Sequence, residues 1–196
     1  METIELAWSK GVAIGAHPGY PDREGFGRRE RLISSREVQS IIEDQLSQFI
    51  SWAAELRAPV GFVKPHGALY LQAQRDPEIA MGVVSALIEY GLPVLGLPGS
   101  VLEREVRRAE LTFVPEGFAD RRYRPDGSLV PRSEPGALID DLSEAERQAL
   151  TLIDRGLRTI CLHGDDPRAL RLADQLQSAF ARAGVLLRSF VGDPEL

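Results

Sequence analysis

Short apolar runs alternate along the chain with longer segments in which apolar residues recur every three or four positions. The first pattern is typical of buried strands and the second of amphipathic helices. Strands are expected at 12–16, in a run ending at Lys64, at 93–97, at 111–115, at 159–163 and at 185–190. This alternation predicts βα units and a mostly parallel sheet.

Capping residues mark several helix starts. Ser34 and Glu37 have capping-box spacing, and Asp76-Pro77 pairs a capping residue with a proline at the first helical position. Helices are expected at 1–10, from Ser34, from Asp76, from Ser100, at 143–155 and from Asp166 to just before Gly184. The helix that starts at Ser34 carries an apolar stripe of Val38, Ile42, Leu46, Phe49, Ala53 and Leu56.

The βα rhythm breaks between residues 118 and 137, FADRRYRPDGSLVPRSEPGA. This stretch is rich in Arg, Pro and Gly, and Pro125-Asp126-Gly127 reads as a turn. Long excursions in compact domains are often functional. No repeat or interdomain linker is visible, so residues 1–196 are expected to form a single α/β domain.

The overall charge and composition narrow the function classes. A formal charge of −6, a pI near 5.2 and the lack of a dense Lys/Arg run argue against nucleic acid as a partner. No apolar run reaches the ~20 residues that span a bilayer, and residues 1–10 do not resemble a signal peptide. Cys161 is the only cysteine, so no intrachain disulfide can form. We therefore expect a cytoplasmic protein that does not contact membranes.

All three histidines fall where an expected strand ends: His17, His66 and His163. In parallel α/β folds the carboxyl edge of the sheet carries the functional site, because the loops there are free to vary. A single histidine at such a place is more often a packing residue. Three of them favour a site, and we expect them to border one cleft.

Other polar residues accompany the histidines. Tyr20 and Asp22 follow His17, Lys64 precedes His66 and Asp165 follows His163, with Gly and Pro between them. Turn chemistry explains the Gly and Pro residues but not the polar ones. Lys64 could bind a substrate carboxylate or phosphate, or bury its stem with its head in water.

Two Arg-rich segments are less specific, GFGRR at 25–29 and DRRY at 120–123. Their glycines and loop positions make Arg28 a candidate for anion binding, and Asp120 and Arg121 possible substrate contacts. Histidines and aspartates could also hold a divalent metal, but no HxxxH or HExxH spacing is present, so the metal stays open. Neither a G-x-S-x-G nor a P-loop motif occurs.

Four segments in this order resemble the LamB/YcsF family of 5-oxoprolinase A subunits: GVAIGAHPGYPDREGFGRR (11–29), VKPHGALY (63–70), FADRRYRPDGSLVPRSEPGALI (118–139) and CLHGDDP (161–167). The resemblance covers nearly the whole chain. It implies a (β/α) barrel of the glycoside hydrolase/deacetylase type. It also implies that the chain acts with subunits B and C to open 5-oxo-L-proline to L-glutamate, with ATP as co-substrate.

Two motifs of the family are absent, an Asn-Cys-Asp-Leu-Gly-Glu strand and a Cys-Gly-x-His-Ala-Gly-Asp segment. Residues 1–10 read instead as a helix that lies mid-chain in the family. The resemblance therefore predicts a barrel that lacks its first βα units, with a gap beside the strand at 12–16.

The residue types suggest roles in lactam opening. His17 or His66 is expected to act as general base, and Lys64 and Asp22 are expected to complete the catalytic group. Contacts with the substrate or an anion are expected from six further residues: Arg28, Tyr20, Asp120, Arg121, His163 and Asp165. Two alternatives remain open. One is a metal-dependent, deacetylase-like hydrolase, and the other is a truncated, non-catalytic binding subunit.

Overall fold

The structure is a computed structural model that describes residues 1–132 and 134–192. It divides into two compact units, Met1–Val114 with the chain from Ser189 onward, and Pro115–Arg188. The expectation of a single domain stays a prediction.

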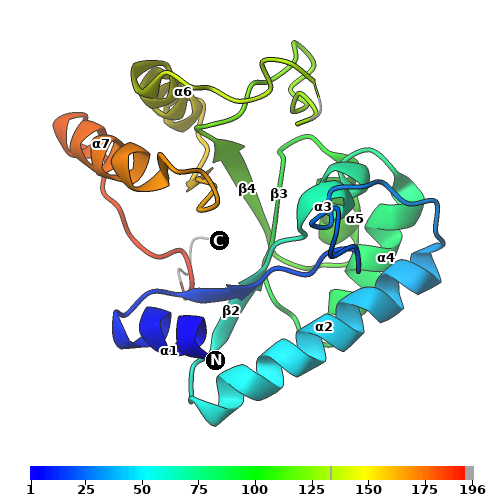
Figure 1. The fold of residues 1–196 in the computed structure, drawn as a ribbon. Coiled ribbons are helices and arrows are strands. Elements are labelled where there is room, and N and C mark those ends of the chain that lie inside the picture. The colour runs from blue at the N-terminus through cyan, green and yellow to red at the C-terminus, as the bar shows by residue number, and fades with distance from the viewer. Residues whose placement is uncertain (133, 193–196) are drawn as a thin grey trace. The chain divides into compact units, whose positions relative to one another are not determined.

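The first unit contains parallel neighbouring strands in chain order, each followed by one or two helices (Figure 1). Its strands are β1 (Ile14–Ala16), β2 (Val60–Val63), β3 (Val94–Gly96) and the first two residues of β4 (Phe113–Phe118). Its helices are α1 (Glu2–Ser9), α2 (Ser35–Glu55), α3 (Gly67–Ala73), α4 (Pro77–Leu87) and α5 (Val101–Arg108).

The second unit contains the rest of β4 and β5 (Thr159–Cys161), which pair in parallel, with α6 (Leu142–Asp154) and α7 (Ala169–Arg182). Residues 119–141 connect β4 to α6 without a helix; position 133 in this stretch lies outside the described residues. Two antiparallel bridges, Arg121 with Leu138 and Tyr123 with Leu129, fold this stretch back on itself. The predicted parallel α/β architecture is confirmed.

The core of the first unit lies between the sheet and helices α2 to α5. The stripe on α2 packs there as predicted, with Val38, Ile42 and Leu46 fully buried against strand residues such as Val63. Burying each such side chain contributes roughly 1.5–3 kcal/mol. The predicted capping box is also present, because Ser34 Oγ accepts from the Glu37 amide while the Glu37 carboxylate accepts from the Ser34 amide.

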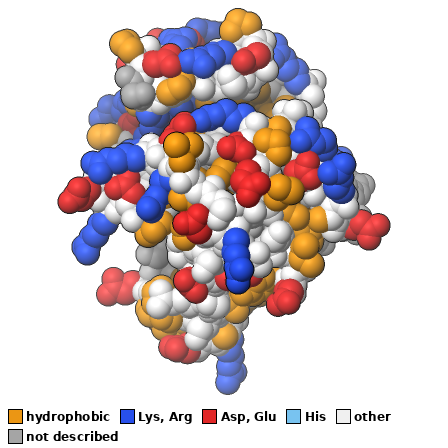
Figure 2. Space-filling view, turned by 90° about the vertical axis from the view of Figure 1, so that its right-hand side faces the viewer, with side chains coloured by type: hydrophobic (Ala, Val, Ile, Leu, Met, Phe, Trp, Pro, Cys, Tyr) orange, Lys and Arg blue, Asp and Glu red, His pale blue; other side chains and the backbone are white. Residues whose placement is uncertain are grey.

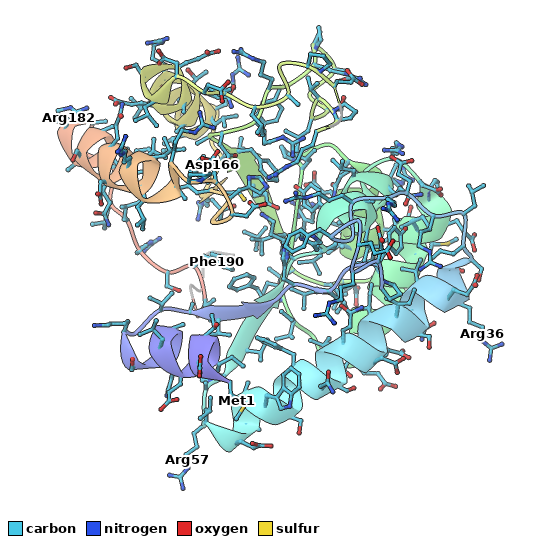
Figure 3. All side chains as sticks on the ribbon, in the orientation of Figure 1. Met1, Arg36, Arg57, Asp166, Arg182 and Phe190 are labelled. Carbon is cyan, nitrogen blue, oxygen red and sulfur yellow. The ribbon has the colours of Figure 1, made fainter. Side chains whose placement is uncertain are left out.

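The other face of this sheet depends on a close approach between β1 and β2. The Phe62 ring lies over Gly15, where a Cβ atom would overlap the ring. Phe190, which is labelled in Figure 3, packs against this ring. The centroids of the Phe190 and Phe62 rings are 5.2 Å apart. Gly15 therefore lets an aromatic pair cover the strand.

A smaller core holds the second unit together. It is formed by buried residues of α6 and α7 with the chain after β4: Ala119, Ile139, Ala145, Ala149, Leu172, Leu176 and Phe180. On its surface, Arg182 pairs with Glu146 at 2.8 Å and so ties α7 to α6.

Several elements differ from the sequence-based expectation, either in their boundaries or in whether they form at all. The fourth strand runs from 113 to 118 rather than from 111 to 115. Helix α3 was not expected, because no capping side chain marks its start at Gly67. Helix α7 begins at Ala169, three residues after Asp166. Residues 185–190, all of them described, form no strand, and both Leu186 and Leu187 are exposed.

The molecular surface carries both signs of charge. On the face shown in Figure 2, acidic and basic side chains are interspersed, and neither sign gathers into one patch. Within the described part of the chain, no helix has both the length and the apolarity needed to cross a membrane.

Replacing Gly15 with Ala should destabilise the protein by about 1–3 kcal/mol, because the new methyl group must displace the Phe62 ring. Urea unfolding followed by far-UV circular dichroism measures this loss. Gly164→Ala is the control: nothing lies within 4 Å of its Cβ position, so its effect should stay within about 0.5 kcal/mol.

Adding Phe62→Leu to Gly15→Ala should recover part of the loss, because a smaller side chain leaves room for the methyl group. Independent, additive effects of the two substitutions would contradict the overlap.

Candidate functional site

His17 and His66 meet at the carboxyl ends of β1 and β2, as their strand-end positions predicted. His17 Nε2 lies 3.0 Å from His66 Nδ1, with the two rings edge to face. The remaining nitrogens contact backbone carbonyls: His17 Nδ1 lies 2.6 Å from the Lys64 oxygen and His66 Nε2 lies 2.7 Å from the Phe26 oxygen. All four ring nitrogens of the pair are therefore engaged.

The backbone of the two strand ends positions these rings. Pairing continues beyond the strands, because the Lys64 amide donates to the Ala16 oxygen and the His66 amide donates to the Pro18 oxygen. Gly27 leaves room for the His66 ring, since a Cβ atom there would lie 3.0 Å from its Cδ2 atom. Gly19, two positions after His17, is similarly close, because a Cβ atom there would lie 3.1 Å from the His66 Cβ atom. The glycine near His17 in the sequence therefore reflects close approach as well as turn formation.

The segment 22–29 folds over His66. Asp22 Oδ1 accepts from the Gly25 amide, and the Gly27 oxygen accepts from the Ala68 amide at the start of α3. Phe26 has a φ of 53°, which is uncommon for a residue with a side chain. The Arg28 guanidinium lies over the Phe26 ring, 4.9 Å from its centroid.

Lys64 and Tyr20 lie near this pair but in different surroundings. Lys64 is half-buried, and its Nζ lies 5.8 Å from the centroid of the Tyr70 ring. Tyr20 belongs to the core of the first unit. Burial, together with the charges of Asp76 and Glu30, raises the pKa of Tyr20 to about 12, so its hydroxyl stays protonated. Its expected contact with substrate stays a prediction.

A pocket of about 250 Å³ opens beside His17. Most of its lining comes from β1 and α2: Ala16, His17, Pro18, Gln45, Leu46, Gln48, Phe49 and Trp52. Gln45 is fixed in place, because its amide both donates to and accepts from the backbone of Gly19. The pocket combines apolar walls with a few polar groups, as small-molecule sites do.

Asp120 and His163 form the second cluster, in the second unit. Phe118 pairs with Cys161 in the parallel register. Asp120 and His163, each two positions further along the chain, are therefore also brought side by side. Asp120 Oδ2 lies 2.7 Å from His163 Nδ1 and also accepts from the His163 amide at 3.1 Å. The Asp120 side chain is 7% exposed, whereas the His163 side chain is 23% exposed.

The carboxylate of Asp120 fixes the tautomer of His163. Burial raises the pKa of Asp120, but hydrogen bonds from His163 and its charge outweigh that effect, and the net pKa is lowered. An ionised carboxylate can only accept, so His163 donates through Nδ1. In the neutral ring Nε2 then carries the lone pair, and no described residue hydrogen-bonds to that nitrogen.

Residues that the sequence analysis did not single out hold this cluster. Gln148 on α6 donates to the oxygens of Phe118, Ala119 and Arg121, which fixes the chain on both sides of Asp120. The Phe118 ring stacks on His163 at 5.7 Å. A glutamine inside a helix gives no local signal of such a role.

Two other expected site residues have different settings. Arg121 is buried and donates to the Val130 oxygen, within the excursion after β4. Asp165 is exposed and lies 3.6 Å from Arg132. Neither contact tests the predicted role in substrate binding.

The structure thus brings the candidates together in two clusters, His17 with His66 and Asp120 with His163. Whether all three histidines border one cleft stays a prediction. Among the described residues, no group of three His, Cys, Asp or Glu side chains could hold a metal ion.

Comparison with known proteins agrees with these motifs. The family model LamB/YcsF matches residues 1–193. A relative from Thermus thermophilus, named as the A subunit of 5-oxoprolinase, is 42% identical over 205 residues, 97% of this chain and 82% of the relative. One of the same name from Methylococcus capsulatus is 40% identical over 206 residues, covering 97% and 79%.

A solved structure is also similar. The crystal structure of a lactam utilization protein from Thermus thermophilus has a TM-score of 0.88 and 41% sequence identity, over 96% of this chain and 81% of that one. At this identity the likeness extends beyond the fold to the sequence.

The Asp120–His163 contact predicts how stability depends on pH. The pKa of Asp120 is lowered in the folded state, so its contribution is present above the unfolded-state pKa of about 3.9 and is lost as the pH falls through the lower folded value. The difference in unfolding free energy between wild type and Asp120→Asn should therefore shrink between pH 7 and about pH 3 in urea titrations.

Asp154→Asn, which removes an exposed carboxylate in the same unit, should show no such change with pH. An Asp120→Asn difference that is constant with pH would mean that the carboxylate charge is not what stabilises the contact.

Proposed function

Because the chain belongs to the LamB/YcsF family, we propose that it is the A subunit of a 5-oxoprolinase, which opens 5-oxo-L-proline to L-glutamate. The family model and the relatives' names support the activity, and the Asp120–His163 geometry supports a division of roles within it. Coupling to ATP and assembly with subunits B and C are parts of the proposal.

Opening a lactam requires water to attack a resonance-stabilised carbonyl and the ring nitrogen to leave as an amine. Water is a weak nucleophile at neutral pH, so a group that removes its proton accelerates the attack, typically by 10²–10⁴-fold. Such a base needs a free lone pair and a fixed orientation. ATP coupling would help in another way, because phosphorylation of the lactam oxygen makes the carbonyl a better electrophile.

His163 meets both requirements for the base, and this is the observation that carries the assignment. Asp120 holds Nδ1 as the protonated nitrogen, which leaves the Nε2 lone pair available to a water molecule. The same carboxylate stabilises the positive ring that forms when Nε2 takes a proton. Asp120 is therefore proposed as the orienting group.

His17 and His66 are less suited to that role than the sequence suggested. Each of their ring nitrogens already contacts a partner, so neither ring offers a lone pair without breaking a hydrogen bond. We assign the proton-accepting step to His163 instead. Lys64, Arg28 and Arg121 remain proposed contacts for the carboxylate of the substrate or for a phosphoryl group.

The names of the relatives support a multi-subunit assembly. Because this sequence has no P-loop, we propose that another subunit supplies the ATP-binding cradle. The chain carries a single cysteine, which fits a reducing cytoplasm.

His163→Gln should lower kcat/KM for glutamate formation from 5-oxo-L-proline and ATP by about 10²–10⁴-fold, because the amide cannot take a proton from water. The assay contains this chain with subunits B and C. Asp120→Asn should lower kcat strongly as well, because an amide neither fixes the tautomer nor stabilises the charged ring.

Asp154→Asn serves as the matched control and should retain wild-type kinetics. Far-UV circular dichroism checks that each variant is folded. A folded His163→Gln protein with wild-type kcat would refute the assignment of the base, and an inactive wild-type assembly would refute the proposed function itself.

A further inference from the structure

We infer that His17 Nε2 and His66 Nδ1 share one proton in addition to the proton on each outer ring nitrogen, so that the pair carries a single positive charge. This pair holds the segment 22–29 against the carboxyl ends of β1 and β2. The role of that segment in catalysis rests on the proposed function. The proton itself follows from hydrogen-bond geometry.

The two outer nitrogens of the pair must both be donors. His17 Nδ1 faces the Lys64 oxygen and His66 Nε2 faces the Phe26 oxygen, and a carbonyl oxygen can only accept. A neutral imidazole carries one proton. If both rings were neutral, that proton would be on the outer nitrogen of each ring.

The inner nitrogens would then face each other with two lone pairs at 3.0 Å. This arrangement is repulsive and is not a hydrogen bond. One further proton between His17 Nε2 and His66 Nδ1 turns it into a good one. Two further protons would place two N–H groups face to face, which is again repulsive. The geometry therefore fits a pair that carries one positive charge.

The outer distances agree with a charged pair. Neutral N–H···O bonds cluster near 2.9–3.0 Å, whereas bonds from charged donors are shorter. The contacts to the Lys64 and Phe26 oxygens, at 2.6 and 2.7 Å, are both in the short range. Both rings are therefore placed to donate to the two carbonyls.

Among the charged groups on neighbouring elements, some oppose a positive charge on the His17–His66 pair and one favours it. Lys64 on the chain after β2 and Arg28 in the segment 22–29 oppose a positive pair, whereas Asp22 in that segment favours it. From α2, the polar side chains beside His17 are the uncharged amides Gln45 and Gln48. The hydrogen bonds to the two carbonyls support the charge, because both carbonyls accept from the pair.

The shared proton has a structural consequence. The chain of contacts runs from the Lys64 oxygen through His17 and His66 to the Phe26 oxygen, so it links β2 to the segment 22–29. Phe26 has a φ of 53°, and its ring contacts the guanidinium of Arg28. His17 and His66 are thus positioning residues for a segment proposed to bind the substrate's anionic group.

The proton can be counted directly by nuclear magnetic resonance. The protein has three histidines, so long-range ¹H–¹⁵N spectra contain six imidazole nitrogens, and His163→Gln identifies two of them. At pH 7 the four remaining nitrogens should carry three protons. Two protons on these four nitrogens would overturn the inference.

Two substitutions of His17 test the role of the shared proton. In His17→Gln the side-chain amide can donate to His66 Nδ1 at any pH, so the contact persists without a charge. His17→Leu, similar in size, cannot donate. Trypsin cleavage at the arginines of the segment should be about tenfold faster in His17→Leu than in wild type and nearly unchanged in His17→Gln.

The urea midpoint tests the same contact without a protease. It should be lower in His17→Leu than in His17→Gln at pH 7, because leucine leaves His66 Nδ1 without the partner that it has in wild type. Equal midpoints of the two variants, or equal cleavage rates in His17→Leu and wild type, would overturn the positioning role.

These readouts do not depend on turnover. If the proton count and the cleavage rates are as expected but the assembly is inactive, the proposed function fails and the shared proton stands. If the assembly is active, His17→Gln should retain more activity than His17→Leu, mainly through KM.

Discussion

The parallel register at the carboxyl ends of the strands is the constraint on which both histidine clusters depend. Ala16 pairs with Val63 and Phe118 pairs with Cys161, so the next residues along each strand leave the sheet side by side. A slip of one residue would turn each side chain to the opposite face. The packing that fixes the register therefore also fixes the functional geometry.

In the first unit, the register is maintained by burial on one face and by close approach on the other. Val63 is fully buried against the helices, while Gly15 accommodates the Phe62 ring. Both keep β1 and β2 aligned, so that the His66 amide can reach the Pro18 oxygen beyond the strand ends.

The sequence predicted the elements whose signals are local. The capping box at Ser34 is complete within four residues, and the three histidines follow apolar runs that can be read directly. The end of β4 could not be read in this way, because Pro115 and Gly117 resemble a turn although the strand continues to Phe118. The contact of Asp120 with His163 depends on that end.

Other parts of the site depend on contacts between distant residues. Gln148 reaches the oxygens on both sides of Asp120 from a helix that follows about thirty residues later, and nothing in its own neighbourhood indicates this. The run 185–190 has strand-like composition, but composition does not supply a neighbouring strand to pair with. Strand propensity alone therefore does not determine whether a strand forms, because strand pairing depends on residues elsewhere in the chain.

The two clusters contain the same type of residue and differ in what surrounds it. A buried carboxylate gives His163 one fixed proton and leaves one lone pair, which is the state of a base. Backbone carbonyls accept hydrogen bonds from the outer nitrogens of His17 and His66, which places one proton on each ring. The contact between the inner nitrogens then requires a third proton, so the pair is charged and serves as a structural contact. The partner of each ring nitrogen, rather than the histidine itself, therefore separates a residue that can accept a proton from residues that hold one.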